Sequence, residues 1–175
     1  MEMLKGILIL MLLLVIFPLA TKGQEQEYNL ETESVSDYVD KILNGPINKE
    51  GLKKMPYKLW FNTNYKTYRL DFETLKDIKK RKLKDLTVLA FMGTWCHDSN
   101  REIPRLMRVL DELGIGEQLE LYALDVDKTS VNGKEKSFDI KKTPTIIFYL
   151  NGEEVARVLE EPKISFEKEL VSILK

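Results

Sequence analysis

The chain carries at residues 87–104 the stretch Thr-Val-Leu-Ala-Phe-Met-Gly-Thr-Trp-Cys-His-Asp-Ser-Asn-Arg-Glu-Ile-Pro. Its first part, Val88 to Met92, is a continuous apolar run, which is typical of a strand buried on both faces of a sheet. Gly93-Thr94 breaks the run, and Cys96 falls where the next helix is expected to begin. A helix N-terminus presents unpaired N–H groups and a partial positive charge, which favour the nucleophilic thiolate. The sequence therefore predicts a strand, a turn and a helix that together present Cys96.

The start of the chain has the pattern of an export signal. Met1 to Lys5 is short and charged, Gly6 to Ala20 is nearly all apolar, and Thr21-Lys22-Gly23 supplies small residues where a signal peptidase would cut. We expect residues 1–23 to be a signal peptide that is cleaved, and the protein to be exported to the periplasm. The alternative is an uncleaved membrane anchor, although an apolar stretch of about 15 residues is short of the ~20 that span a bilayer.

The composition narrows the classes of function. The 175 residues are 43% hydrophobic and 31% charged, with a net charge of −1, as in an ordinary globular domain. Charges of both signs are interspersed, so the basic face that nucleic-acid binding requires is not expected. A metal site would have only the adjacent Cys96, His97 and Asp98 to draw on, because the chain has a single histidine. We therefore expect neither a metal nor a cofactor.

Cys96 is the only cysteine. It cannot form an internal disulfide, and an unpaired thiol is a chemical liability in an exported protein. Its presence favours a reactive role over that of a buried bystander.

Residues 24–70 are predicted to be an N-terminal extension with three parts. Residues 24–33 are acidic and lack periodicity, which indicates a flexible lead-in. Apolar residues at helical spacing predict a short helix over 35–43, after Ser34 as a cap. The aromatic segments 57–61 and 65–70 alternate well enough for a hairpin or a pair of extended segments. These aromatics are expected to pack on the sheet, or alternatively to form a partner-binding lip beside the cysteine.

Residues 71–175 are predicted to form one α/β domain. Asp71 caps a helix before the central strand, and after Cys96 a helix with Pro104 inside it runs to Gly114. The later elements are a strand over 119–126, a short helix over 133–138, a strand from Thr143, a turn at Asn151-Gly152, a strand over 155–158 and a helix over 164–174. The order β-α-β-α-β-β-α predicts a central mixed sheet flanked by helices.

With these elements in place, residues 70–174 resemble the thioredoxin superfamily. Trp95-Cys96-His97-Asp98-Ser99 is similar to its Trp-Cys-x-x-Cys motif, Pro104 to its helix proline, and Thr143-Pro144-Thr145 to its later proline before a strand. The segment from Cys96 to Pro104, with Glu102 six residues after the cysteine, is most similar to secreted bacterial thiol-disulfide reductases. The resemblance implies a thioredoxin-like fold, and its main departure is Ser99 in place of the second cysteine.

The resemblance also implies roles around the cysteine. Cys96 would attack a disulfide sulfur and form a mixed disulfide with its partner. Ser99 could keep the hydrogen bond that the second cysteine makes to the thiolate, but it could not resolve the mixed disulfide. Alternatively, Ser99 is a hydroxyl in the first turn of the helix without a role. Trp95 would wall one side of Cys96, pack against the fold, or do both. His97 as an imidazolium would favour the thiolate, whereas Asp98 would oppose it.

By the same resemblance, Pro144 is expected to be a cis proline that places the backbone of Thr143 opposite Cys96. The alternative is an ordinary trans proline at the start of a strand. Thr143, Pro144 and Thr145 would then form a cis-proline edge that pairs with an extended partner chain without reading its sequence.

Many thioredoxins carry a buried Asp six residues before the nucleophile and a Lys on the neighbouring strand. Here those positions hold Ala90 and Ala123. Losing only one partner would leave a buried charge uncompensated, so their joint absence suits a site that skips the resolving step. Glu102 could substitute as an acid/base group, or be an exposed helical residue without a role.

The sequence thus favours an exported monothiol protein that reduces or isomerises disulfides of partner proteins through Cys96. A second thiol, on the substrate or on a small molecule, would complete the reaction. The alternative is a redox-inert binding module that holds client polypeptides at the cis-proline edge.

Overall fold

The structure is a computed structural model that describes residues 27–34 and 40–174. Six strands form one sheet in the order β1-β2-β4-β3-β5-β6. Strands β3 and β4 are parallel and the other neighbours are antiparallel. The strand bounds are β1 Leu30–Glu33, β2 Lys41–Ile47, β3 Leu86–Met92, β4 Leu119–Ala123, β5 Thr145–Leu150 and β6 Glu153–Leu159. The predicted mixed sheet of an α/β fold is confirmed.

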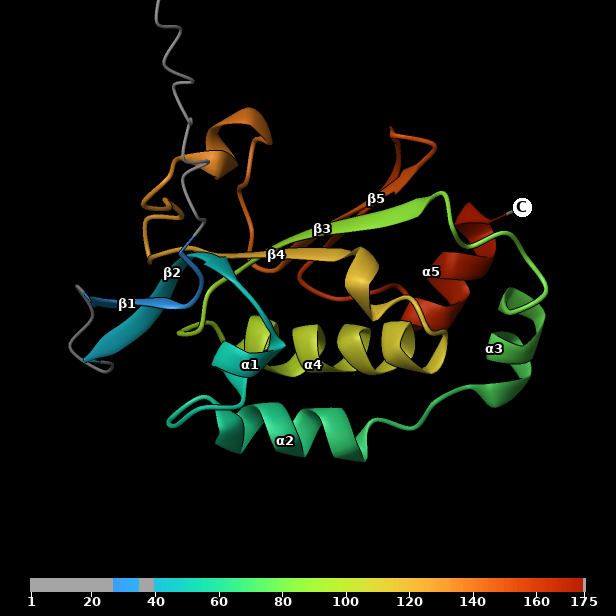
Figure 1. The fold of residues 1–175 in the computed structure, drawn as a ribbon, viewed down its shortest axis with the longest axis horizontal. Helices are drawn as coiled ribbons and strands as arrows, with labels where there is room; N and C mark the ends of the chain where they lie inside the picture. The colour runs from blue at the N-terminus through green and yellow to red at the C-terminus, as the bar shows by residue number, and fades with distance from the viewer. Residues whose placement is uncertain (1–26, 35–39, 175) are drawn as a thin grey trace, which may run out of the picture.

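Helices flank this sheet (Figure 1). They are α1 Lys49–Leu52, α2 Lys58–Thr67, α3 Phe72–Ile78, α4 His97–Glu112 and α5 Phe166–Ile173, with short 3₁₀ turns η1 Gly116–Gln118 and η2 Lys134–Ser137. Helix α4 runs along the sheet, and α2 lies on the side of α4 that faces away from it (Figure 1). Within the described residues, no helix has both the length and the apolar character needed to cross a membrane.

Strand β3 is the centre of the core. Its alternate residues Val88, Ala90 and Met92 belong to the larger apolar cluster, and Leu89 and Phe91 belong to a second, smaller cluster. Successive side chains of a strand point to opposite faces, so β3 is buried on both sides of the sheet. This is the burial that its continuous apolar run predicts.

Several helices and strands begin or end at the residues that the local sequence predicts. The Asp71 carboxylate accepts a hydrogen bond from the Thr74 amide at 3.0 Å and caps α3. Gly114 follows α4 with a φ of +72°, and the β5–β6 turn places Asn151 and Gly152 at φ of 54° and 82°. These are left-handed conformations that glycine and asparagine adopt most readily.

The predicted helix over 35–43 is wrong where the structure describes it. Residues 41–43 belong to β2, and residues 35–39 lie outside the described part of the chain. Ile42 and Leu43 are buried because β2 pairs with β4 on one side and with β1 on the other. Part of the acidic lead-in also forms β1, the edge strand. Residues 41–43 pair with β1, and residues 45–47 of the same strand pair with the distant strand β4. This pairing overrides the helical spacing of these few residues.

The predicted hairpin over 57–70 is also wrong, because Lys58–Thr67 is the helix α2. Tyr57, Phe61 and Tyr65 recur every fourth residue, so they share one helix face, and that face packs into the core. The rings of Phe61 and Tyr65 are stacked with centroids 5.6 Å apart. Their burial against the core favours packing over the alternative of a partner-binding lip.

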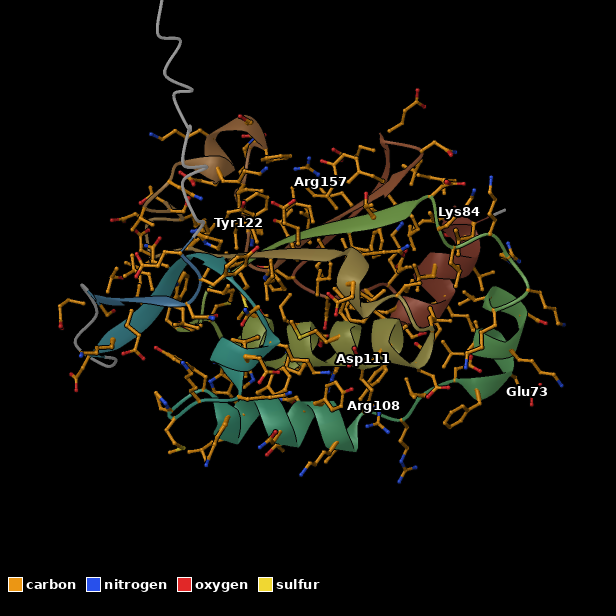
Figure 2. All side chains as sticks on the ribbon, in the orientation of Figure 1. Glu73, Lys84, Arg108, Asp111, Tyr122 and Arg157 are labelled. Atoms are coloured by element: carbon orange, nitrogen blue, oxygen red, sulfur yellow. The ribbon has the colours of Figure 1, made fainter. Side chains whose placement is uncertain are left out.

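The described part of the predicted N-terminal extension is fastened to α4. Asp111 of α4 is labelled in Figure 2, and its carboxylate accepts hydrogen bonds from Lys49 of α1 and, at 2.5 Å, from the Tyr65 hydroxyl of α2. Burial, followed by the hydrogen bond to Asp111, raises the pKa of Tyr65. The extension therefore shares its core with the rest of the fold. The predicted signal peptide over 1–23 lies outside the described residues.

Two later elements are shorter than predicted. Strand β4 ends at Ala123 instead of continuing to Val126, and the helix predicted over 133–138 is the 3₁₀ turn η2. The chain after Ala123 turns instead to form the loop beside Trp95, where the Leu124 carbonyl accepts a side-chain hydrogen bond.

Candidate functional site

The site is built where β3 passes into α4. Cys96 is the N-cap residue of α4, with φ −88° and ψ 125°, and its thiol is free and partly exposed. Its amide donates to the Gly93 carbonyl at 3.0 Å, and its carbonyl accepts from the Asn100 amide at 3.0 Å. The thiol therefore lies at the N-terminus of a helix of 16 residues, the end that carries the positive pole of the helix dipole.

The Thr143–Pro144 peptide bond is cis, as predicted from the sequence, and it lies next to Cys96. The Cys96 thiol donates a hydrogen bond to the Thr143 carbonyl, with Sγ and O 3.1 Å apart. Thr145 is buried, and its hydroxyl donates to the Lys142 carbonyl at 2.7 Å. A second cis bond, Met55–Pro56, was not anticipated from the sequence.

Ser99 is fully buried, and its hydroxyl bonds to the chain before Cys96. Its Oγ accepts a hydrogen bond from the Gly93 amide at 3.1 Å. Ser99 lies in the first turn of α4, so its side chain reaches back beneath the 93–95 turn to the end of β3. In the described residues its hydroxyl therefore stabilises the turn that presents the cysteine, which differs from the hydrogen bond to the thiolate that the family resemblance allows.

Trp95 is held from two sides. Its Nε1 donates to the Leu124 carbonyl at 2.9 Å. Its ring covers Gly93 so closely that a Cβ on that residue would lie 2.5 Å from Trp95 Cε2. Glycine is therefore required at position 93 by this close approach. Trp95 packs against the turn and remains half-buried beside Cys96.

His97 and Asp98 begin the helix and differ in their surroundings. His97 is exposed. Asp98 forms an ion pair with Arg101, with Oδ1 and Nη1 2.8 Å apart. In the part of the chain that the structure describes, no group of three or more His, Cys, Asp or Glu side chains is arranged to hold a metal ion.

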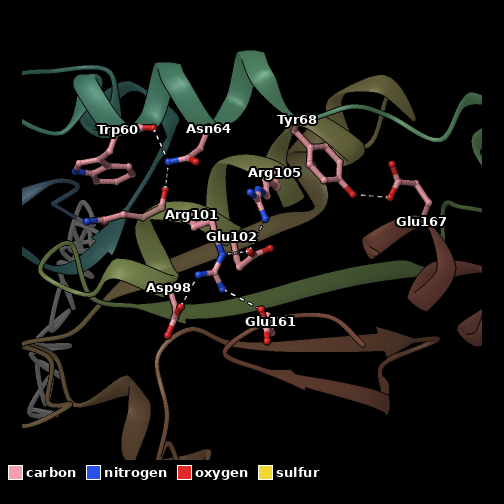
Figure 3. Close-up of polar contacts among 10 residues, drawn as sticks. Trp60, Asn64, Tyr68, Asp98, Arg101, Glu102, Arg105, Glu161 and Glu167 are labelled. Atoms are coloured by element: carbon pink, nitrogen blue, oxygen red, sulfur yellow. Dashed lines mark hydrogen bonds and ion pairs between the residues drawn. The ribbon is translucent and has the colours of Figure 1, made fainter. Parts of the chain in front are cut away.

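Glu102 is buried, with 2% of its surface exposed, and lies between two arginines (Figure 3). Its Oε1 accepts from Arg101 Nε at 2.5 Å and from Arg105 Nη1 at 2.8 Å. The hydrogen bond between Arg101 and Glu102 is the main reason that the pKa of Arg101 is raised above its usual range, and Asp98 adds to the effect. Glu102 is thus not an exposed helical residue; it is the buried counter-ion of two guanidinium groups, both of which bond to its Oε1.

The two positions that carry a buried Asp and Lys in many thioredoxins lie in the core here. Ala90 of β3 and Ala123 of β4 are both fully buried in the larger apolar cluster. Ala90 stands opposite Leu121, and Ala123 stands opposite Met92. The core beneath the cysteine turn is therefore apolar at both positions.

Sequence reasoning missed two contributors to the site. Thr94 is buried, and its Oγ1 accepts from the Leu43 amide at 3.2 Å, which ties β2 to the cysteine turn. Arg101 reaches Glu161, which is 60 positions later in the chain. Thr94 could have been suspected from its place inside the motif, but nothing in the sequence points to Glu161.

The comparisons with known proteins agree with this geometry. The family model described as Thioredoxin matches residues 70–173, which is more than half of the chain. Thioredoxin-2 of Saccharomyces cerevisiae is 31% identical over 74 residues, covering 42% of this chain and 66% of that protein. Thioredoxin H9 of Arabidopsis thaliana is 28% identical over 89 residues, covering 51% of this chain and 60% of that protein. The chain thus spans slightly less than two thirds of the length of these relatives.

Among solved structures, thioredoxin O2 of Arabidopsis thaliana is similar with a TM-score of 0.40 and 16% identity, over 62% of this chain and 92% of that chain. The match of the family model over residues 70–173 includes the strand, the cysteine helix and the cis proline of the site. The chain therefore belongs to the thioredoxin family.

Proposed function

We propose that this protein is an exported monothiol disulfide reductase or isomerase that acts through a mixed disulfide at Cys96. Its membership of the thioredoxin family supports thiol-disulfide chemistry in general. The observation that carries the proposal is the position of the only cysteine. Cys96 is partly exposed at the N-terminus of α4, and its sulfur lies 3.1 Å from the Thr143 carbonyl of the cis-proline edge.

The first step is an exchange of sulfur–sulfur bonds. The Cys96 thiolate attacks one sulfur of a client disulfide, the client bond breaks, and a bond between Cys96 and that sulfur forms. The second client sulfur leaves as a thiolate and takes a proton from water. An extended client would pair its backbone with the cis-proline edge during this step.

Completion needs a second thiol from outside this chain, because the chain has no other cysteine. If a client thiolate attacks the client sulfur of the mixed disulfide, a new client disulfide forms and Cys96 leaves as a thiolate, which is isomerisation. If a small-molecule thiolate attacks the Cys96 sulfur, the reduced client leaves. A second molecule of the small thiol then regenerates Cys96 as the disulfide of the small thiol forms.

Ser99 supports the monothiol form of the proposal. It stands three residues after Cys96, where a resolving thiol would be expected, yet its hydroxyl is buried and accepts the Gly93 amide. A hydroxyl cannot take the place of a thiol in disulfide exchange. The mixed disulfide is therefore expected to persist until another thiol arrives.

Export is supported by the pattern of residues 1–23, a charged start, an apolar stretch and small residues. The partners would then be disulfide- or thiol-containing proteins outside the cytoplasm, together with a small-molecule thiol. An uncleaved signal would bring the same domain to the membrane surface as an anchored form.

The test is to incubate the protein with a peptide that contains one disulfide and to resolve the products by non-reducing gel and intact mass. The wild type should form a one-to-one covalent adduct, and Cys96→Ala should form none while keeping its thermal unfolding temperature. A wild type that binds the peptide as tightly as Cys96→Ala and forms no adduct would replace the proposal with the redox-inert binding module.

A further inference from the structure

The guanidinium of Arg101 binds three carboxylates from two parts of the chain (Figure 3). Its Nη1 lies 2.8 Å from Asp98, its Nε 2.5 Å from Glu102, and its Nη2 3.1 Å from Glu161. Asp98 and Glu102 belong to α4, the helix that Cys96 caps, whereas Glu161 follows β6. A planar guanidinium with five donors can serve several acceptors at once, which an ammonium group cannot do in the same geometry.

Of the three carboxylates that Arg101 binds, Glu102 is the one that is buried in the protein. Glu102 is buried, and Arg105 occupies its Oε1 as well. Arg105 in turn lies over the ring of Tyr68, with its Cζ 5.8 Å from the ring centroid. Since Arg101 is hydrogen-bonded to a buried and doubly paired carboxylate, its guanidinium is held in place and presents its remaining donors outward.

The outer end is attached to the cis-proline edge. The Glu160 amide donates to the Pro144 carbonyl at 2.8 Å, and the Glu160 carboxylate pairs with Lys142 at 3.0 Å. The segment 160–161 is therefore bonded to both sides of Thr143. Among the described residues, the Arg101–Glu161 contact is the one ion pair that joins α4 to this segment.

We propose that Arg101 is a positioning residue for disulfide exchange, which sets the position of Cys96 relative to the cis-proline edge. This inference rests on the proposed function. The ion pair between Arg101 and Glu161 links the helix that carries the sulfur to the segment that is bonded to the cis-proline edge. It therefore helps to set whether the disulfide of a client on that edge meets the sulfur in line. A small alkylating reagent reacts with Cys96 without using the cis-proline edge, so its rate should not depend on this ion pair.

The variant that tests this is Glu161→Gln, which removes the outer charge and leaves Arg101 bound to Asp98 and Glu102. Arg101→Lys is a second variant, which keeps the positive charge but loses the planar guanidinium with its several donors. The matched control is Glu154→Gln, at the other end of β6. The Glu154 carboxylate accepts hydrogen bonds from Arg157 Nε at 2.9 Å and Arg157 Nη2 at 3.0 Å, and the substitution removes its charge. Each protein is assayed for iodoacetamide alkylation of Cys96 and for mixed-disulfide formation with a capped, uncharged disulfide peptide.

For Glu161→Gln, adduct formation should slow about two- to fivefold, the range expected for an exposed ion pair, with alkylation unchanged. The Debye length is about 3 Å at 1 M salt, so 1 M NaCl should slow the wild type toward the variant and leave the variant unaffected. The inference is overturned if Glu161→Gln captures the peptide at the wild-type rate, if alkylation falls in parallel, or if Glu154→Gln has the same effect. Absence of any adduct in the wild type would instead refute the proposed function itself.

Discussion

Replacing Ser99 with alanine removes the acceptor of a buried amide and thereby tests what this serine does. The Gly93 amide donates to Ser99 Oγ at 3.1 Å, and the serine side chain has no exposed surface. In Ser99→Ala that amide would stay buried without a partner, which costs about 1–3 kcal/mol. For a chain of this size, the unfolding temperature should fall by about 2–4 °C for each kcal/mol. The thiol should remain reactive, because Cys96 keeps its place at the N-terminus of α4.

The assay is urea unfolding followed by tryptophan fluorescence, together with the rate of Cys96 alkylation at neutral pH. Ser172→Ala is the matched control, because Ser172 is exposed on α5 and its hydroxyl donates to the Glu169 carbonyl at 2.7 Å. The control should change stability by no more than about 0.5 kcal/mol. The reasoning fails if Ser99→Ala is as stable as the control, or if it keeps its stability and loses thiol reactivity.

Three further variants test the packing and charges around the site. Gly93→Ala brings a Cβ to 2.5 Å from the Trp95 ring, so in a Trp60→Phe background the fluorescence of Trp95 should shift to the red; an unchanged spectrum would contradict the close approach. Ala90→Asp buries a carboxylate without a cation and should cost about 3–5 kcal/mol in urea unfolding, and an unchanged midpoint would refute this. Asp71→Ala removes the cap of α3. Hydrogen bonds from Thr74 lower the pKa of Asp71 from 3.8 to about 2, so the wild-type stability advantage should be full at pH 7 and be lost as the pH falls from 3.8 toward 2. A thermal-unfolding gap of equal size at pH 7 and pH 2 would count against it.

The elements around the cysteine could be predicted because their signals are local. The apolar run of β3, the glycine that ends it, Asp71 at the start of α3 and Gly114 after α4 each act within a few residues. The conformation of such elements follows from neighbours in the sequence. The prediction that these elements assemble into a thioredoxin-like domain depends on the resemblance of the motifs to that superfamily.

The errors arose where distant contacts decide the structure. Phe61 and Tyr65 are strand-favouring residues, yet with the N-cap residue Tyr57 they form one face of α2, because α4 and the core lie against that face. Residues 41–43 are a strand because they pair with β1, and the same strand continues at residues 45–47 into pairing with β4, which comes much later in the chain.

The burial and the partners of Glu102 could not be predicted from the sequence either, because they depend on how α4 packs in the fold. Its spacing from the cysteine indicated an acid/base role or a solvated helix position, and only the packing of α4 shows that it is buried between Arg101 and Arg105. The partner that completes the arrangement, Glu161, comes from a loop at the other end of the domain sequence.

The central claim is that Cys96 holds a client covalently and that this chain cannot release it alone. The direct measurement is the lifetime of a purified Cys96–peptide mixed disulfide, followed by intact mass without added thiol, in the wild type and in Ser99→Cys. The wild-type adduct should persist, and Ser99→Cys should release the peptide as a thiol at position 99 attacks Cys96 within the first turn of α4. Release of the peptide by the wild type without any added thiol would contradict the account, as would a Ser99→Cys adduct that lasts as long as that of the wild type.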